Sequence, residues 1–263
     1  MADSDLAPRL DEFRNHFNHL KDELQKVIVG QDDIIIHTLM ALVAGGHVLL
    51  EGVPGLGKTL LVKTISRALK LDFQRVQFTP DLMPADLIGG KIFVDDGKGN
   101  ARFEFSRGPL FCNLLLGDEI NRATPKTQSA LLEAMQEKHV SVGGVTYQLD
   151  APFFVLATQN PLEQEGTYPL PEAQLDRFFF KLHARYPTFE EFENILLRTI
   201  EKSSPQVDAV FDGHRLVEMG ALAREIPIPP TIRQRAVELV MSTHPETEFA
   251  TADIKSYVQF GAS

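Results

Sequence analysis

Short apolar runs alternate with helical patterns through most of this chain, and that alternation restricts the fold more than any other feature. The runs are "HVLL", "FQRVQF", "CNLLLG", "FFVLAT" and "RFFFKL", and helix-like segments separate them. Strands that alternate with helices are joined by right-handed crossovers, which places the strands side by side in a parallel sheet. We therefore expect an α/β fold whose parallel sheet carries helices on both faces.

Two segments break this alternation with a period of two around glycine turns. They are residues 91–105, "KIFVDDGKGNARFEF", and residues 139–149, "HVSVGGVTYQL". Alternation of this kind on both sides of a glycine-rich turn is typical of a β-hairpin. We expect two hairpins inserted into the α/β domain.

The strand patterns end near Pro187, and only helical patterns follow, at about 189–202, 212–225, 230–243 and from 251 onward. The α/β part begins with an amphipathic helix over residues 6–28. We expect two domains: an α/β domain over residues 1–186 and a small all-helical domain over residues 187–263.

Charge and cysteine content argue against several classes of protein. The chain has 36 acidic and 26 basic residues, so its net charge of −10 disfavours binding to nucleic acid or to anionic membranes. Its most apolar window, residues 34–50, is interrupted by polar residues and glycines, so we expect no membrane segment. Its single cysteine, Cys112, and an N-terminus without signal-peptide features favour a cytoplasmic protein.

The stretch "EGVPGLGKTLLVKTI", residues 51–65, has the pattern of a phosphate-binding loop. Gly52 is followed by four residues and then by Gly57, Lys58 and Thr59, between an apolar run and a helical pattern. Glycines let backbone amides turn toward phosphates, Lys58 is placed to reach the β- and γ-phosphates, and Thr59 to reach Mg²⁺. An ordinary glycine-rich turn would explain the glycines but not the Lys-Thr pair. We therefore expect a nucleotide site here.

Two adjacent carboxylates, Asp118 and Glu119, end the apolar run "LLLGDEI". Successive residues at a strand end point in different directions, so the two acids can have different tasks. We expect Asp118 to support Mg²⁺ and Glu119 to polarise an attacking water, as phosphoryl transfer to water requires. Alone the pair would be consistent with two solvated acids, but beside a phosphate-binding loop it indicates an ATPase. No Asn-Lys-x-Asp guanine-binding motif is present in "NRAT" or "NPLE".

Two further polar residues follow later strands. Asn160 comes directly after "VLATQ" and is placed to point its amide at the γ-phosphate or the attacking water, although Asn-Pro also starts turns for local reasons. Arg177 lies in "LPEAQLDRFFF", where pairing with a surface carboxylate such as Asp176 is the ordinary explanation.

Taken together and in this order, "IVGQ", "GVPGLGKT", "LLLGDEI", "ATQNP" and "LPEAQLDRF" resemble the MoxR family of AAA+ ATPases over nearly the whole chain. The resemblance implies a five-stranded AAA+ core, a helical lid, and ATP hydrolysis with Mg²⁺ at the subunit interfaces of a ring, usually a hexamer. It implies that Asn160 is the first sensor, and that Arg177 is an arginine finger that reaches the neighbour's γ-phosphate. One departure is Gly117, where relatives often carry alanine.

The nucleotide-contacting residues that the motif and the resemblance imply fall in two segments. The first lies near the adenine, and the second is the phosphate-binding loop: Val29, Gly30 and Gln31; Gly52, Pro54, Gly55, Leu56, Gly57, Lys58, Thr59 and Leu60. The hairpins at 91–105 and 139–149 are similar to the helix-2 insert and the pre-sensor hairpin, both of which face the pore or the client.

The resemblance also implies a biological role in chaperone-like remodelling or metal-cofactor insertion for client enzymes, often with a von Willebrand A-domain partner. A nucleotide-gated scaffold that hydrolyses little and a helicase-like DNA motor remain alternatives, and the acidic charge disfavours the second.

The closing residues "SYVQFGAS" resemble a family segment that continues as Pro-Arg-Gly into a further lid helix, whose arginine is the second sensor. We therefore expect a fragment whose lid is truncated before that helix, with an uncovered apolar face on 230–243, poor hydrolysis and weak ring assembly.

Overall fold

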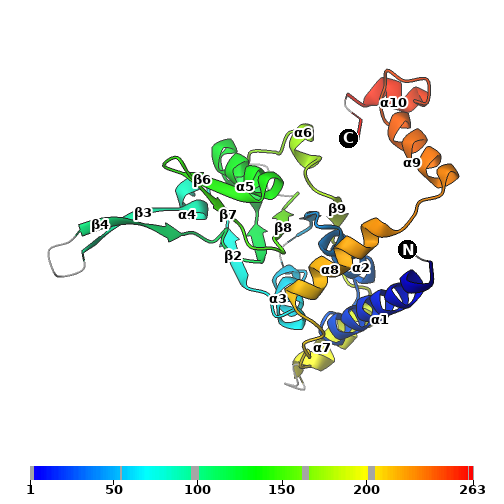
Figure 1. The fold of residues 1–263 in the computed structure, drawn as a ribbon, viewed down its shortest axis with the longest axis horizontal. Helices are drawn as coiled ribbons and strands as arrows, with labels where there is room; N and C mark the ends of the chain where they lie inside the picture. The colour runs from blue at the N-terminus through cyan, green and yellow to red at the C-terminus, as the bar shows by residue number, and fades with distance from the viewer. Residues whose placement is uncertain are drawn as a thin grey trace.

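The computed structural model describes residues 3–53, 55–95, 101–161, 166–200, 205–259 and 261–262. Its centre is a five-stranded sheet in the order β2-β5-β8-β1-β9, in which every neighbouring pair runs parallel. The strands are β1 (Val48–Glu51), β2 (Phe73–Gln77), β5 (Leu114–Asp118), β8 (Phe154–Gln159) and β9 (Phe180–His183). Each strand coincides with one of the apolar runs, so the expected parallel α/β core is confirmed (Figure 1).

Helices cover both faces of this sheet, which explains why its central strands are apolar throughout. On β5, Leu114 and Leu116 face one buried cluster while Leu115 faces the other. The first cluster includes residues of α1 (Asp3–Val27), α2 (Asp32–Ala44) and α3 (Lys58–Ala68), and the second includes residues of α5 (Pro125–Glu137). The shorter helices are α4 (Pro84–Ile88), η1 (Ile120–Arg122) and α6 (Glu172–Leu175). No helix in the described ranges is both long and apolar enough to cross a membrane.

Two antiparallel hairpins are inserted between these elements, as expected. β3 (Gly89–Asp95) pairs with β4 (Ala101–Arg107), and β6 (His139–Val142) pairs with β7 (Val145–Gln148). The first hairpin extends two residues further on each strand than its alternating pattern indicates. On β3 the extra residues are Gly89 and Gly90, which have no side chains to carry the alternation. It projects away from the body of the protein (Figure 1). The turn expected at its tip lies outside the described residues.

After β9 the described chain is helical, with α7 (Phe189–Ile200), α8 (Gly213–Glu225), α9 (Pro230–Ser242) and α10 (Ala252–Tyr257). α8 packs into the first cluster through Leu216 and Met219, which are 1% and 2% exposed. α9 and α10 stand apart from the sheet, and the apolar residues of α9 are open to solvent (Figure 1). The last helix is shorter than its pattern predicts, since it ends at Tyr257.

Candidate active site

The glycine-rich loop joins the carboxyl end of β1 to the first turn of α3. Gly55 and Gly57 have φ angles of 88° and 75°, in the left-handed region that favours glycine. A Cβ on either residue would meet no atom within 4 Å, so the backbone conformation, and not crowding, requires glycine there. This turn places the unpaired amides of the α3 N-terminus at the carboxyl edge of the sheet, where anions are stabilised. Pro54 lies outside the described residues.

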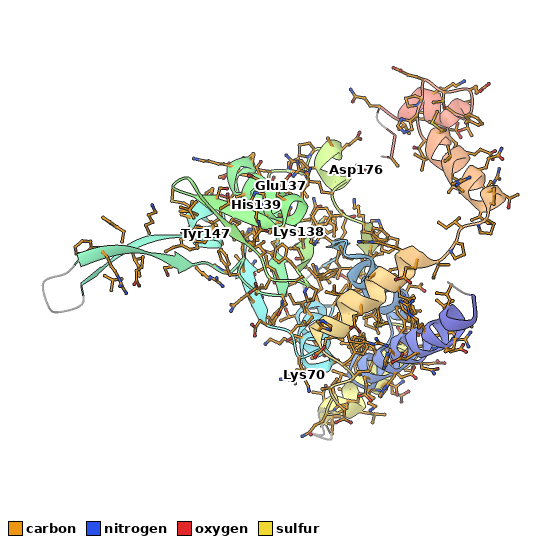
Figure 2. All side chains as sticks on the ribbon, in the orientation of Figure 1. Lys70, Glu137, Lys138, His139, Tyr147 and Asp176 are labelled. Carbon is orange, nitrogen blue, oxygen red and sulfur yellow. The ribbon has the colours of Figure 1, made fainter. Side chains whose placement is uncertain are left out.

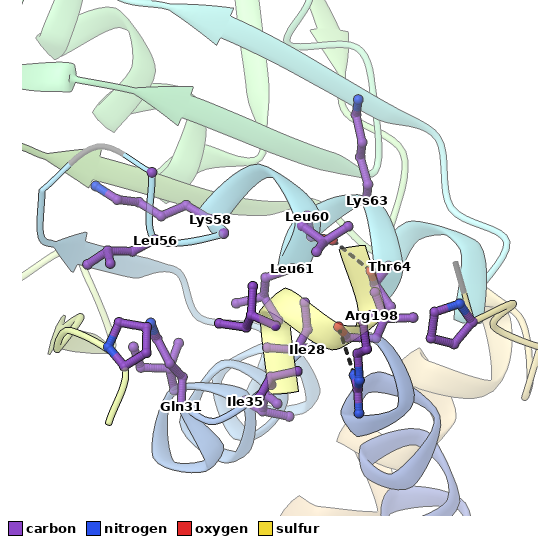
Figure 3. A pocket seen from close by; sticks show the side chains of 18 of the residues that line it. Ile28, Gln31, Ile35, Leu56, Lys58, Leu60, Leu61, Lys63, Thr64 and Arg198 are labelled. Carbon is purple, nitrogen blue, oxygen red and sulfur yellow. Dashed lines mark hydrogen bonds between the residues drawn. The ribbon is translucent and has the colours of Figure 1, made fainter. Parts of the chain in front are cut away.

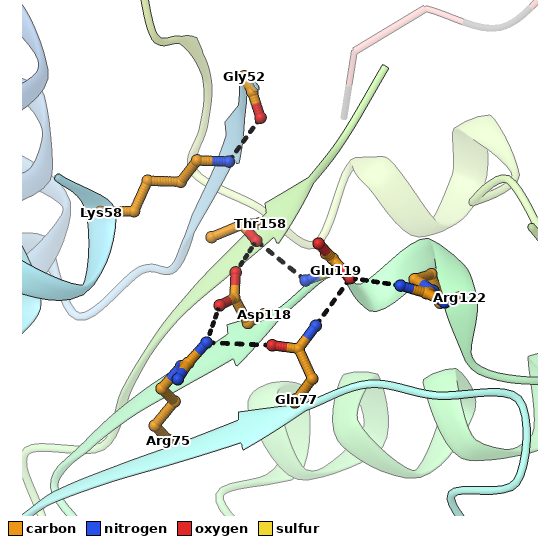
Figure 4. A network of polar contacts seen from close by, with 8 residues as sticks. All are labelled: Gly52, Lys58, Arg75, Gln77, Asp118, Glu119, Arg122 and Thr158. Atoms are coloured by element: carbon orange, nitrogen blue, oxygen red, sulfur yellow. Dashed lines mark hydrogen bonds and ion pairs between the residues drawn. The ribbon is translucent and has the colours of Figure 1, made fainter. Parts of the chain in front are cut away.

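Lys58 is the first residue of α3, and Thr59 follows it in the same turn. The Lys58 Nζ donates a hydrogen bond of 2.6 Å to the carbonyl oxygen of Gly52, which keeps the side chain over the loop (Figure 4). Burial lowers the pKa of Lys58, and the negative charges of Asp118 and Glu119 oppose that shift. The lysine and the acidic pair therefore interact electrostatically.

Asp118 is the last residue of β5 and has a partner on each side. Its Oδ2 forms an ion pair of 2.7 Å with Arg75 Nη2 of β2. Its Oδ1 accepts a hydrogen bond of 2.6 Å from the hydroxyl of Thr158, a fully buried residue of β8. The two neighbouring strands thus fix the orientation of this carboxylate.

Glu119 turns away from the strand in a left-handed conformation, with φ 57° and ψ 52°. Its Oε2 accepts hydrogen bonds from Gln77 Nε2 at 2.7 Å and Arg122 Nη1 at 3.1 Å. Its backbone N–H donates to the Thr158 hydroxyl at 2.9 Å, so one hydroxyl contacts both acidic residues (Figure 4). The two carboxylates point toward different partners, as the strand-end argument predicts.

The order β5-β8-β1 puts Asn160 between the acidic pair and the glycine-rich loop, because Asn160 directly follows β8. Its side chain is buried, at 5% exposure. Arg177 lies elsewhere: it follows α6 and donates a hydrogen bond of 3.0 Å to the carbonyl oxygen of Leu132 in α5. Within the described part of the chain, Arg177 makes no hydrogen bond or ion pair with Lys58, Asp118 or Glu119.

A cavity of about 850 Å³ adjoins the glycine-rich loop (Figure 3). Val29 and Gln31 line it from the α1–α2 connection, together with loop and α3 residues that include Leu56, Lys58 and Leu60. Gly30, between them, has a φ of 70°, and a Cβ there would lie 2.5 Å from Glu191 Oε1 of α7. The segment expected near the adenine therefore borders the same cavity as the expected phosphate loop.

Several site residues were not foreseen from the sequence. Arg75, Gln77, Arg122 and Thr158 contact the acidic pair, and the cavity is also lined by Lys63, Arg67, Tyr186, Arg198 and Thr199. One usable signal exists for two of them: Arg75 and Gln77 are two apart at the end of a strand, so their side chains share a face.

Comparisons with known proteins agree with this geometry. The model of the ATPase family associated with various cellular activities (AAA) matches residues 47–180. Chaperone MoxR1 of Mycobacterium tuberculosis is 46% identical over 92% of this chain, and YeaC of Bacillus subtilis is 46% identical over 94%. The aligned part spans 63% of MoxR1 and 75% of YeaC.

A solved structure from Cytophaga hutchinsonii has the same fold, with a TM-score of 0.86 and 46% identity over 96% of this chain and 76% of that chain. Protein MoxR of Methylorubrum extorquens is 34% identical over 68% of this chain and 52% of its own length. These similarities confirm the resemblance seen in the motifs, and this chain belongs to the MoxR family of AAA+ ATPases.

Proposed function

We propose that this chain binds ATP with Mg²⁺ at the glycine-rich loop and hydrolyses it at the acidic pair. The observation that carries the proposal is the convergence of Lys58, Asp118, Glu119 and Asn160 at the carboxyl ends of neighbouring parallel strands. Ligand sites in open α/β sheets lie at this edge. The proposed nucleotide contacts come from the cavity and the loop: Val29, Gly30, Gln31, Gly52, Gly55, Leu56, Gly57, Lys58, Thr59 and Leu60.

Each residue has a task that its position supports. The amides of the α3 N-terminus, whose N–H groups carry partial positive charge, and the Lys58 ammonium stabilise phosphate charge. Thr59 and Asp118 hold Mg²⁺, which binds proteins through few side chains and takes its other ligands from phosphate and water. Bound ATP supplies the phosphoryl group, and Mg²⁺ neutralises its charge. Glu119 polarises the attacking water and Asn160 orients it.

The proposal extends to a homo-oligomeric ring, a hexamer in the family, in which Arg177 serves the neighbouring subunit's site. Two observations support it: Arg177 contacts the Leu132 carbonyl and not its own subunit's acidic pair, and one relative is named a chaperone. We also propose a domain boundary near residue 186, a cytoplasmic location, a von Willebrand A-domain partner, and a client enzyme that the ring remodels.

A nucleotide-gated scaffold with little hydrolysis is the second candidate. Both carboxylates already have partners within the chain: Asp118 pairs with Arg75, and Glu119 accepts a hydrogen bond from Gln77. Those contacts must rearrange before Asp118 can contact Mg²⁺ and Glu119 can contact water. Slow turnover in the isolated chain is the expected result of that arrangement. A DNA motor has no such support, and the net charge of −10 opposes it.

Steady-state ATPase assays and nucleotide-binding measurements on three proteins test the proposal. Glu119→Gln is expected to bind ATP like the wild type and to lose turnover, because an amide keeps the shape but cannot polarise water. Lys58→Ala is expected to lose ATP binding itself. Wild-type turnover by Glu119→Gln would show that the assigned base is wrong, and tight ATP binding without turnover in the wild type would favour the scaffold.

A further inference from the structure

A buried histidine and a partly buried lysine meet at the edge of the sheet opposite to the acidic pair. His47 directly precedes β1 and is 4% exposed, and Lys138 caps the C-terminal end of α5 (Figure 2). The Lys138 Nζ lies 2.6 Å from His47 Nε2, which also lies 3.1 Å from the carbonyl oxygen of Met135. The backbone N–H of Val155 donates to His47 Nδ1 at 3.0 Å.

These contacts determine where the protons are. Because His47 Nδ1 accepts the Val155 N–H, a neutral ring carries its proton on Nε2 and donates from there. An ammonium group at 2.6 Å from that nitrogen would place two donors against each other, whereas a neutral amine offers a lone pair. Burial lowers the pKa of Lys138 to about 8, and burial and then the Lys138 charge lower the pKa of His47 to about 3. The geometry and the burial therefore favour the neutral, nucleophilic form of the amine far more than in an exposed lysine.

Lys138 also lines a small pocket of about 300 Å³ between α2, α8 and the segment before β8. Most of its lining is apolar, with contributions from Leu42, Phe153 and Leu216. The Lys138 Nζ lies 5.7 Å from the centre of the Phe153 ring. The exposed Arg224 of α8 contributes the one guanidinium that the pocket lining includes within the described residues. A nucleophile, an apolar space and a cationic rim thus occur together.

We propose that Lys138 is a carbon dioxide site, at which its neutral amine forms a carbamate. The nitrogen lone pair forms the new N–C bond, one C=O π pair moves onto oxygen, and one N–H proton leaves to solvent, so that Lys–NH₂ + CO₂ gives Lys–NH–COO⁻ + H⁺. His47 Nε2–H keeps the Met135 carbonyl as an acceptor when the amine turns into the pocket.

Two features favour CO₂ over other electrophiles. An apolar lining admits a small uncharged molecule more readily than a charged acyl donor. The product is an anion, which the Arg224 guanidinium at the rim can stabilise. An amide or imine product would be uncharged or cationic and would not use that arginine.

Trapping on the wild-type protein tests the site without any assumption about ATP. The protein is equilibrated with ¹³C-bicarbonate at pH 7.5, alkylated with a trialkyloxonium salt, digested and analysed by mass spectrometry. A lysine of pKa about 8 is about a quarter neutral at that pH, against about 0.1% for an ordinary lysine, which predicts a roughly two-hundredfold enrichment of trapped carbamate. The internal control is Lys126, an exposed residue in the first turn of the same helix.

The expected result is label on Lys138 that disappears after CO₂ is removed and is absent from Lys138→Arg. Arg224→Gln, a change at an exposed side chain, is expected to lower the trapped yield severalfold. No label on Lys138, or equal label on Lys126, would overturn the proposal. Because the readout is a covalent mass on one lysine, the outcome for the carbamate proposal does not depend on the outcome of the ATPase assays.

Discussion

Replacing Thr158 with valine removes the hydroxyl that contacts both members of the acidic pair while keeping the shape of the buried side chain. Two hydrogen bonds are lost: one to Asp118 Oδ1 at 2.6 Å and one from the Glu119 N–H at 2.9 Å. A hydrogen bond to a charged group contributes about 1.5–3 kcal/mol, and a buried N–H left without a partner costs about 1–3 kcal/mol. The second hydrogen bond supports the backbone of Glu119, which is in the unfavourable left-handed region, so its loss makes that conformation harder to hold.

We expect Thr158→Val to lower kcat for ATP by about 10- to 100-fold, which corresponds to about 1.4–2.7 kcal/mol of activation free energy. The Mg²⁺ concentration that gives half-maximal rate is expected to rise, because Asp118 loses the contact that orients it. The matched control is Thr127→Val, since Thr127 is equally buried and donates a hydrogen bond of 2.7 Å to the Leu82 carbonyl, away from the acidic pair.

The assay is steady-state ATP hydrolysis across a Mg²⁺ titration, with thermal unfolding of every variant. Thr158→Ser, which keeps the hydroxyl, is expected to recover most of the rate. Turnover of Thr158→Val within twofold of the wild type would refute the reasoning, as would a serine variant as slow as the valine one. An equal loss in Thr127→Val would show that general destabilisation, and not orientation of the acidic pair, is the cause.

Three further predictions concern the interface, the adenine side and pH. Arg177→Ala subunits are expected to lose about 10³-fold or more in ATPase rate, and mixing with Lys58→Ala subunits should restore part of it; no recovery in assembled mixtures would contradict action on a neighbour. Gly30→Ala should weaken ATP binding by about tenfold, or about 1.4 kcal/mol, because its Cβ displaces Glu191, while Gly144→Ala, with a φ of 80° and no atom within 4 Å, should leave Kd unchanged. The pKa of His47 is lowered to about 3, so the folded state binds fewer protons than the unfolded state and stability falls as pH drops from 6.5 toward 3. Between pH 7 and pH 5 this lowers the free energy of unfolding of the wild type by about 2 kcal/mol. Denaturant titrations at the two pH values should show a decrease smaller by that amount in His47→Asn; an equal decrease in both proteins would show that His47 is not the titrating group.

The parallel sheet was predictable because its three central strands, β1, β5 and β8, are buried on both faces, so each is apolar at nearly every position. Leu114, Leu115 and Leu116 illustrate this, since neighbours in sequence belong to opposite clusters. The glycine-rich loop was predictable because positive φ at Gly55 and Gly57 is a local property of the chain. Local conformational requirements of this kind can be predicted from the sequence without knowing the tertiary arrangement.

The contacts around the acidic pair were not predictable, because they depend on which strands are neighbours. Arg75 reaches Asp118 only because β2 lies beside β5, and Thr158 reaches it only because β8 lies on the other side. The meeting of His47 and Lys138, 91 residues apart, is of the same kind. Their residue types alone carry no signal, since isolated threonines, histidines and lysines occur in most sequences.

The hairpin of β3 and β4 has a mechanical consequence. Each strand has seven residues, so at about 3.4 Å per residue the arm is about 24 Å long. Its base is held where the Gly108 N–H donates to the Ile88 carbonyl at 3.0 Å. A rotation of about 10° at that base would displace the far ends of the two strands by about 4 Å for an arm of this length. A small rotation at the base of this hairpin is therefore converted into a displacement of several ångströms at the far ends of its strands.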